Sequence, residues 1–294
     1  MTIRLGTNPI AWSNDDLREL GGATPLETCL SEARAAGYAG IEMGHKFPRE
    51  PDALRAMLCA HDLALVSGWY SSRLLERPPE DEMTAMRPHM DLLRALGCRV
   101  LILSETSNAI HGDRTKPLSG RPILPESAWS VFANRLTKLA DLVRAEGMTL
   151  AYHHHMGTII QTEPEIDRLM TLTGDSLTLL LDTGHATFAG ADAVALAGRH
   201  RHRITHIHCK DVRPAVMAAA LGADQSFLDA VVGGVFAVPG DGGVDFPAVL
   251  AALSGYDGWL VVEAEQDPRK APPLLHASRG FANLSAYARR AGLH

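Results

Sequence analysis

The sequence predicts a single (β/α)8 barrel of the TIM type, spanning residues 1–294. Short apolar runs typical of strands alternate with helical patterns, which implies parallel strands joined by right-handed crossovers. Eight such units within roughly 250–300 residues favour closure into a barrel. No linker is long enough to divide the chain. A doubly wound open sheet is the alternative, but no GxGxxG motif follows the first strand.

The expected strands are short runs rich in β-branched and aliphatic residues. They cover residues 3–7, 39–43, 63–68, 98–104, 148–153, 177–182, 204–208 and 258–263. The expected helices show apolar side chains at helical spacing. They cover residues 25–36, 51–61, 82–96, 127–146, 162–173, 191–198, 246–253 and 275–291.

Start and stop residues support several of these helices. The starts are Thr24-Pro25, Pro51-Asp52, Ser127, and Thr162 followed by Glu165 at the spacing of a capping box. Three helices end at Gly37, Gly97 and Gly147, directly before strands. Glycine fills the left-handed position after a helix at little cost, so these residues mark the helix ends.

The longest irregular stretches, 105–126 and 210–245, both follow strands. They should therefore lie on the carboxyl face of the barrel, where the active sites of such barrels are found. The segment VPGDGGVDF (238–246) is rich in glycine but lacks the GxxxxGK(S/T) pattern. We interpret it as a tight loop that leads into the seventh helix, and not as a phosphate cradle.

The composition limits the partners of the chain. The net charge is −6, so no basic field favours nucleic acid. The four cysteines are scattered without CxxC pairs, which is typical of a reducing compartment. The first residues, MTIRLGTN, enter a strand without a signal-like stretch, and no run approaches a membrane span. We expect a cytoplasmic protein without a membrane partner; a homo-oligomer stays open.

Four segments end in metal-type side chains, each at the exit of an expected strand. They are TLAYHHH (149–155), LTLLLDTGH (177–185), ITHIHCKD (204–211) and WLVVEAEQD (259–267). The carboxyl ends of parallel barrel strands meet at one face. A buried divalent ion needs three or four nitrogen and oxygen donors from different strands. The sequence therefore predicts metal-assisted chemistry at this face.

Strand alternation selects residues within two of these segments. If Val261 points into the barrel, Glu263 lies at its rim, and a nearly buried carboxylate there needs a cation or hydrogen bonds. We expect Glu263 to bind metal and leave Glu265 open, since a solvated acidic strand end is the alternative. Asp182 follows five strand residues, where an Asp often caps a turn. His185, on the same loop, could reach the same cavity.

The histidines follow the same logic. His206 and His208 share one strand phase, and we expect His208 at the rim to be the metal donor and His206 to be a core histidine. His153 and His155 face one way and His154 the other. A polar strand terminus is the alternative, but two inward imidazoles are costly to bury without partners, so we expect both near the site.

Other strand exits carry polar or aromatic groups that could either bind substrate or simply pack. Together they describe a pocket with hydroxyl-binding donors and an apolar wall, which suits a polyol or sugar. The expected substrate-binding residues are Asn8, Trp12, Glu42, Lys46, Trp69, His185 and Arg213.

The pattern Asp182-Thr183-Gly184-His185, then His208, then a glutamate on the eighth strand resembles the xylose isomerase-like barrel superfamily. A closer resemblance, nearly end to end, is to the myo-inosose-2 dehydratase family. It rests on GTNPIAWSNDD (6–16), GIEMGHKFPR (40–49), AYHHHMGT (151–158), HCKDVR (208–213), VPGDGGVDFPAVL (238–250) and VVEAEQDP (261–268).

This resemblance implies a lyase of inositol catabolism. Such an enzyme removes water from 2-keto-myo-inositol (scyllo-inosose) and gives 3D-3,5/4-trihydroxycyclohexane-1,2-dione, by α-proton abstraction, an enediolate and loss of a β-hydroxyl. The resemblance also implies a divalent metal, manganese or cobalt, and glutathione. Its ligand pattern maps onto His153, Asp182, His208 and Glu263.

One departure is informative. Isomerases of the superfamily carry an E-x-H-x-G pattern on the fifth strand, whose Glu binds metal and can act as a base. Here His153 occupies the Glu position and His155 the His position. Epimerisation uses two opposed bases, so the loss of one carboxylate favours a dehydratase.

The candidates for proton transfer are Glu263, His153 and His155, with Lys210 or Glu42 as leaving-group acids. The main alternative is a metal-dependent inosose or ketose isomerase or epimerase on the same barrel. An apurinic endonuclease would need three metals and a basic face, which this acidic chain lacks. A polyol-binding protein without catalysis would not need four metal-type strand ends.

Overall fold

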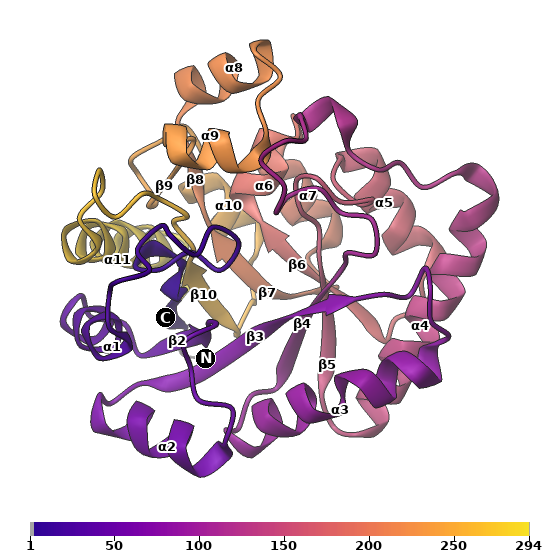
Figure 1. The fold of residues 1–294 in the computed structure, drawn as a ribbon, viewed down its shortest axis with the longest axis horizontal. Helices are drawn as coiled ribbons and strands as arrows, with labels where there is room; N and C mark the ends of the chain where they lie inside the picture. Colours follow the sequence, from indigo (N-terminus) through magenta and orange to yellow (C-terminus); the bar gives the residue numbers. More distant parts are fainter. Residues whose placement is uncertain (1–2, 294) are drawn as a thin grey trace.

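A computed structural model describes residues 3–293, and eight parallel strands in it close into a barrel (Figure 1). The strands are β1 Arg4–Thr7, β2 Gly40–Met43, β3 Ala64–Ser72, β4 Val100–Glu105, β5 Thr149–His153, β6 Leu177–Asp182, β7 Ile204–Cys209 and β10 Trp259–Val262. Their order around the barrel is β1-β10-β7-β6-β5-β4-β3-β2, so β10 pairs with β1 and closes the sheet. The predicted fold class is confirmed.

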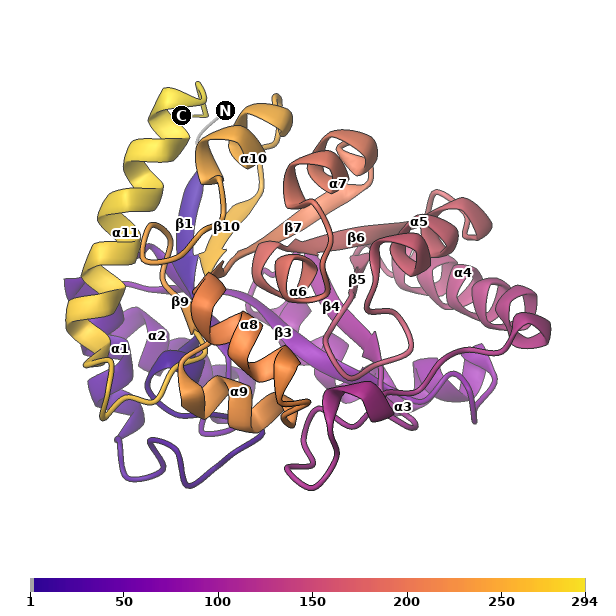
Figure 2. The ribbon, with the colours of Figure 1, turned by 90° about the horizontal axis from the view of Figure 1, so that it is seen from above.

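Helices surround the barrel and connect its strands (Figures 1 and 2). They are α1 Leu26–Ala35, α2 Pro51–Ala60, α3 Pro79–Ala95, α4 Trp129–Ala145, α5 Glu163–Leu172, α6 Thr183–Phe188, α7 Ala193–His200, α10 Phe246–Ala252 and α11 Pro273–Arg290. The predicted capping box at Thr162 and Glu165 is present at the start of α5. No described helix combines the length and apolarity that a membrane span needs.

The stretch 210–245, expected to be irregular, contains two helices and a small ribbon. Its elements are β8 Asp211–Val212, α8 Pro214–Gly222, α9 Phe227–Gly233 and β9 Phe236–Ala237, and β8 pairs antiparallel with β9. The sequence of α8, PAVMAAALG, is apolar throughout, so it has no polar face whose period would reveal a helix. Figure 2 shows α8 and α9 close to the chain that follows β4, where Leu118 N donates to Gln225 O at 3.0 Å.

The interior of the barrel is layered, and the layers determine where the site forms. Val261 packs inside against Val66 and Trp259, and Ile102, Ala151 and Leu180 form a second apolar cluster. Because side chains alternate along each strand, the residue two positions beyond each inward apolar residue points into the mouth. These residues are His153 and Asp182 at the ends of β5 and β6, and Glu263 directly after β10.

The glycine-rich loop 238–246 is tied to Asp211. The Asp211 carboxylate accepts hydrogen bonds from Gly240 N at 2.8 Å, Gly242 N at 2.9 Å and Val244 N at 2.9 Å. These amides are therefore not free to bind phosphate. The segment is a tight loop that leads into α10, as the sequence predicted.

We expect Gly242→Ala to destabilise the fold by about 1–3 kcal/mol, because the added Cβ would lie 2.3 Å from Val212 O and 2.4 Å from Asp211 Oδ1. Gly198→Ala within α7 is the matched control. Its Cβ meets nothing within 4 Å, so helix propensity should stabilise that variant by about 0.5–1 kcal/mol. Urea unfolding measures the free energy of unfolding of both variants, provided that their m-values are equal. Equal free energies for the two variants would contradict the assigned packing of the loop.

Candidate metal centre and active site

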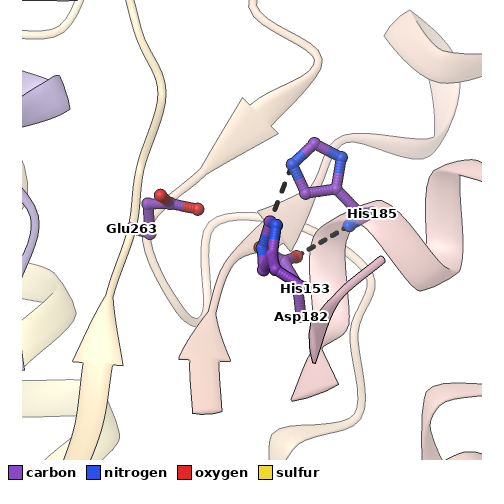
Figure 3. A group of neighbouring side chains, drawn as sticks. All are labelled: His153, Asp182, His185 and Glu263. Atoms are coloured by element: carbon purple, nitrogen blue, oxygen red, sulfur yellow. Dashed lines mark hydrogen bonds and ion pairs between the residues drawn. The ribbon is translucent and has the colours of Figure 1, made fainter. Parts of the chain in front are cut away.

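Four of the predicted metal-type side chains lie together at the carboxyl ends of β5, β6, β7 and β10. His208 Nδ1 is 3.0 Å from Glu263 Oε2 and 3.4 Å from Asp182 Oδ2. His153 Nε2 is 3.4 Å from the same Asp182 oxygen. All four side chains are buried. Figure 3 shows His153 beside Asp182, with the Glu263 carboxylate turned toward them from β10.

The spacing of these atoms fits a divalent metal ion. Two ligand atoms at roughly 2.1 Å from a first-row metal lie about 3.0 Å apart at a right angle and about 3.4 Å apart at the tetrahedral angle. In addition, His208 Nδ1 and Glu263 Oε2 are buried and make no hydrogen bond of good geometry, although they are neighbours and Lys210 Nζ lies 2.7 Å from Glu263 Oε2. A metal ion between them would satisfy both atoms.

The charge of the site also calls for a cation. Burial by itself would raise the pKa of Asp182, but the Lys210 ammonium and nearby imidazoles hold it well below its usual range. The pKa of Glu263 is lowered too, because His208 and Lys210 outweigh its burial. Glu42 likewise has a lowered pKa, since His208 and His206 outweigh burial. Of these three buried carboxylates, Asp182 and Glu263 lie near Lys210, whereas Glu42 contacts imidazoles and an amide. A divalent ion would balance the excess negative charge.

Glu42 holds His208 from the side away from the candidate metal position. His208 Nε2 lies 3.1 Å from the Glu42 carboxylate, which also accepts from His206 Nε2 at 2.7 Å and Asn8 Nδ2 at 2.7 Å. A proton on Nε2 leaves Nδ1 of His208 free to bind metal, the arrangement by which carboxylates orient metal-binding histidines. Asn8 also donates to Glu263 Oε1 at 3.1 Å, so one amide aligns two carboxylates.

We expect Glu42→Gln to weaken the binding of a divalent metal by about 10–100-fold, since the amide no longer fixes the His208 tautomer. The measurement is competition with a coloured chelator. Glu32→Gln is the control, because Glu32 accepts a comparable ring N–H, Trp12 Nε1 at 2.7 Å, outside the site. Equal metal affinity in both variants would contradict the orienting role of Glu42.

Comparison with known proteins shows the family of this chain. A family model described as xylose isomerase-like TIM barrel matches residues 30–285. This chain belongs to that family. Rhizopine catabolism protein MocC of Rhizobium meliloti is 52% identical over 99% of this chain and 90% of its own length. An inosose dehydratase of Geobacillus thermodenitrificans is 44% identical over 94% of each chain.

A solved structure described as IolI protein with a binding zinc atom has a TM-score of 0.64. The identity is 17%, over 99% of this chain and 98% of that chain. At that identity the likeness supports the shared fold alone.

In this xylose isomerase-like chain, the predicted catalytic residues lie around one pocket. His153, His155, Lys210 and Glu263 all line it. His155 Nδ1 donates to Met156 O at 2.7 Å, since a carbonyl can only accept, and this leaves Nε2 unprotonated in the neutral ring. Burial lowers the pKa of His155 well below its usual range, with neighbouring imidazoles adding to the effect.

Lys210 is a buried cation between carboxylates. Its Nζ lies 2.7 Å from Glu263 Oε2 and 3.6 Å from Asp182 Oδ2, and 4.5 Å from the centre of the Phe236 ring. Burial would lower its pKa, but Asp182 and Glu263 raise it above its usual value. Lys210 is therefore a source of positive potential beside the carboxylates. Its expected role as a leaving-group acid stays a prediction.

Among the predicted substrate-binding residues, Asn8, Glu42 and Trp69 line the pocket. Trp69 packs edge-on against His153 and His155, with ring centres 5.2 and 5.6 Å apart, and forms the expected apolar wall. Glu42 needs a correction. Because three protein donors already occupy its ionised carboxylate, it positions His208 and is not a leaving-group acid.

His185 lies behind the pocket. It is buried, its Nε2 lies 3.0 Å from Lys210 Nζ, and its Nδ1 accepts from Met156 N at 3.3 Å. Figure 3 shows its ring beside His153. One of its ring nitrogens lies within 4.8 Å of potential metal-binding atoms of His153, Asp182 and Glu263. We therefore revise its role from substrate binding to support of Lys210 and of the metal-type cluster.

Three predicted substrate-binding residues lie outside the pocket. Trp12 is fully buried and donates to Glu32, as described above. Lys46 Nζ donates to Gly22 O at 2.8 Å and Thr24 O at 2.6 Å. Arg213 donates to Gly234 O at 2.7 Å and Phe236 O at 2.9 Å. At these positions the chain has already turned away from the barrel mouth. The three side chains therefore contact neighbouring segments and not the pocket.

The pocket also contains residues that sequence reasoning missed. They are Ile10, Asp15, Asp16, Met43, Ile102 and His111. Glu265, left open by the sequence, lines the pocket as well, and burial raises its pKa to about 8. Ile102 could have been found from the phase of its strand. Asp15, Asp16 and His111 lie on loops, for which the sequence predicts only the face of the barrel.

Proposed function

We propose that this chain is a metal-dependent inosose dehydratase, a carbon–oxygen lyase of inositol catabolism. The substrate is scyllo-inosose, and the product is 3D-3,5/4-trihydroxycyclohexane-1,2-dione. The observation that carries this proposal is the 44% identity with a relative named inosose dehydratase over 94% of each chain. The buried cluster of carboxylates and imidazoles at the barrel mouth supports it.

We assign His153, Asp182, His208 and Glu263 to the metal. Two imidazoles and two carboxylates suit Mn²⁺ or Co²⁺, the ions that we propose. Such an ion supplies a Lewis acid, which lowers the cost of negative charge on the substrate oxygens. The contacts from Glu42 and Asn8 hold two of the four ligands in place before substrate arrives.

We assign the α-proton abstraction to His155. Its Nδ1–H is held by the Met156 carbonyl, so Nε2 presents a lone pair to the pocket. The buried ammonium of Lys210 stabilises the negative charge of the enediolate. The β-hydroxyl then leaves as water with the proton that His155 took, and the resulting enol tautomerises to the dione. No net proton is gained or lost by the protein.

The fifth strand supports dehydration over epimerisation. Epimerisation on this barrel uses two opposed carboxylate bases, and the strand-5 position here holds His153. Among the described residues, the carboxylate within 4 Å of the His153 imidazole belongs to Asp182, which comes from the adjacent strand β6 and not from the opposite wall. A single imidazole base that returns its proton to a leaving hydroxyl fits this arrangement better.

The test is incubation of the metal-loaded protein with scyllo-inosose, with the absorbance of the dione followed and the product identified by mass. We expect a product smaller than the substrate by one water. A product of unchanged mass would instead identify an isomerase or epimerase. Parallel reactions with and without glutathione test the cofactor that only the family resemblance implies.

A second substrate class deserves a parallel assay. The relative named rhizopine catabolism protein is 52% identical, more than the inosose dehydratase of Geobacillus thermodenitrificans. Cyclic keto-polyols derived from rhizopine should therefore be compared with scyllo-inosose. If kcat/KM is higher for the rhizopine-derived compound than for scyllo-inosose, that compound replaces scyllo-inosose as the proposed substrate. The proposed reaction class stays the same.

A further inference from the structure

We propose that His111 is a substrate-binding residue of this pocket, and that it recognises a hydroxyl group of the cyclic polyol away from the metal ligands. This inference rests on the proposed function. His111 comes from the long segment between β4 and α4 and lines the pocket. Its ring packs edge-on against His155 and Trp69, with ring centres 4.9 and 6.3 Å apart.

The backbone at His111 is fixed against the exit of β5. Ile110 N donates to Gly157 O at 2.9 Å. Gly157 has a φ of +78°, and a Cβ there would lie only 2.9 Å from His111 N. The glycine of the HHHMG segment thus allows a loop from another part of the chain to pack directly on it. This contact places a further imidazole beside His155.

The ring nitrogens of His111 have no protein partner among the described residues. Its Nδ1 is buried without a hydrogen bond, so a proton there would be unsatisfied, and the neutral ring keeps its proton on Nε2. By contrast, each of the other imidazoles around the pocket has one ring nitrogen in contact with a protein group: His153 with Asp182, His155 with Met156, and His208 with Glu42. His111 Nε2–H is therefore a donor that the protein itself does not use.

A polyol ring carries a hydroxyl on most of its carbons, so it offers hydroxyls beyond those at the metal ligands and Lys210. Trp69 and His111 form a further part of the pocket lining, an apolar surface next to a polar group. That combination binds the C–H face of a sugar-like ring and one of its hydroxyls. The loss of such a neutral hydrogen bond weakens binding by about tenfold.

His111→Phe tests this assignment because it keeps an aromatic ring against Trp69 and His155 but removes the donor. We expect KM for scyllo-inosose to rise about tenfold with a smaller change in kcat, and metal affinity to stay unchanged. His111→Gln, whose amide can reach the position of Nε2, should recover part of the affinity. His202→Phe, at an exposed position, is the matched control.

The outcomes separate this inference from the proposed function. If the parent protein forms the dione and His111→Phe keeps its KM within twofold, the inference is wrong. If the parent forms no dione, calorimetry with myo-inositol, a cyclic polyol without the ketone, decides the matter. Weaker binding by His111→Phe than by His202→Phe then still supports the role of His111, and equal binding overturns it.

Discussion

Asp182→Asn is expected to lower the rate of inosose dehydration by at least about a thousandfold, since a metal ligand supplies several kcal/mol of charge stabilisation. Asp182 Oδ2 is close to both His153 and His208. Its Oδ1 accepts from His185 N at 2.8 Å and caps α6. Asparagine caps helices as well as aspartate does, so this substitution removes the charge while keeping the cap.

Asp192→Asn provides the matched control. Asp192 caps α7 in the same manner, by accepting from Val194 N and Ala195 N, but it lies at an exposed position. The control variant should keep full activity and metal content. Elemental analysis of both proteins after dialysis checks the cause, since only Asp182→Asn should lose bound metal. A fully metal-loaded, active Asp182→Asn protein would remove Asp182 from the proposed ligand set.

Lys210→Met is expected to destabilise the metal-free protein by about 3–5 kcal/mol, because it leaves buried carboxylates without their cation. Methionine keeps much of the volume of the lysine stem, so the loss of charge dominates the effect. The same substitution should greatly reduce activity, since the ammonium lies 2.7 Å from Glu263. Urea unfolding with and without Mn²⁺ measures the stability, and added metal should restore part of it.

Lys270→Met is the control for this experiment. Lys270 donates to Val232 O at 2.7 Å from an exposed position, and surface substitutions usually change stability by less than about 0.5 kcal/mol. If Lys210→Met were as stable as this control, the carboxylates around Lys210 would not depend on its charge. The electrostatic account of the pocket would then be wrong.

The barrel and the centre of the site could be predicted because their signals are local. The alternation of strands and helices determines the parallel sheet, and the two-residue period of a strand determines which side chains face inward. From Val261 alone, Glu263 follows at the rim. Asp182 and His208 follow from the same rule on β6 and β7, whose register pairs these two residues directly.

The roles of Glu42 and His206 could not be predicted in this way. Glu42 on β2 contacts His206 and His208 on β7, and these strands are not neighbours in the barrel. A contact across the barrel interior depends on its diameter and on the size of the intervening side chains. The sequence therefore predicted a core histidine at His206 without its carboxylate partner.

Loop residues were the other limit. Trp12, Lys46 and Arg213 each follow a strand by a few residues, and beyond the strand end the chain direction depends on turns and packing. His111 shows the converse case. It lies in the loop after β4, six residues beyond Glu105, and the contact with Gly157 brings it to the pocket. Only the packing of two distant segments determines that position.

Metal titration of the dehydration reaction tests the central claim most directly. The protein is stripped with a chelator, Mn²⁺ or Co²⁺ is added in steps, and the initial rate of dione formation from scyllo-inosose is measured. We predict no activity in the stripped protein and a rate that rises to a plateau at about one ion per chain. Full dione formation in the stripped protein, or no dione at any metal concentration, would contradict the account.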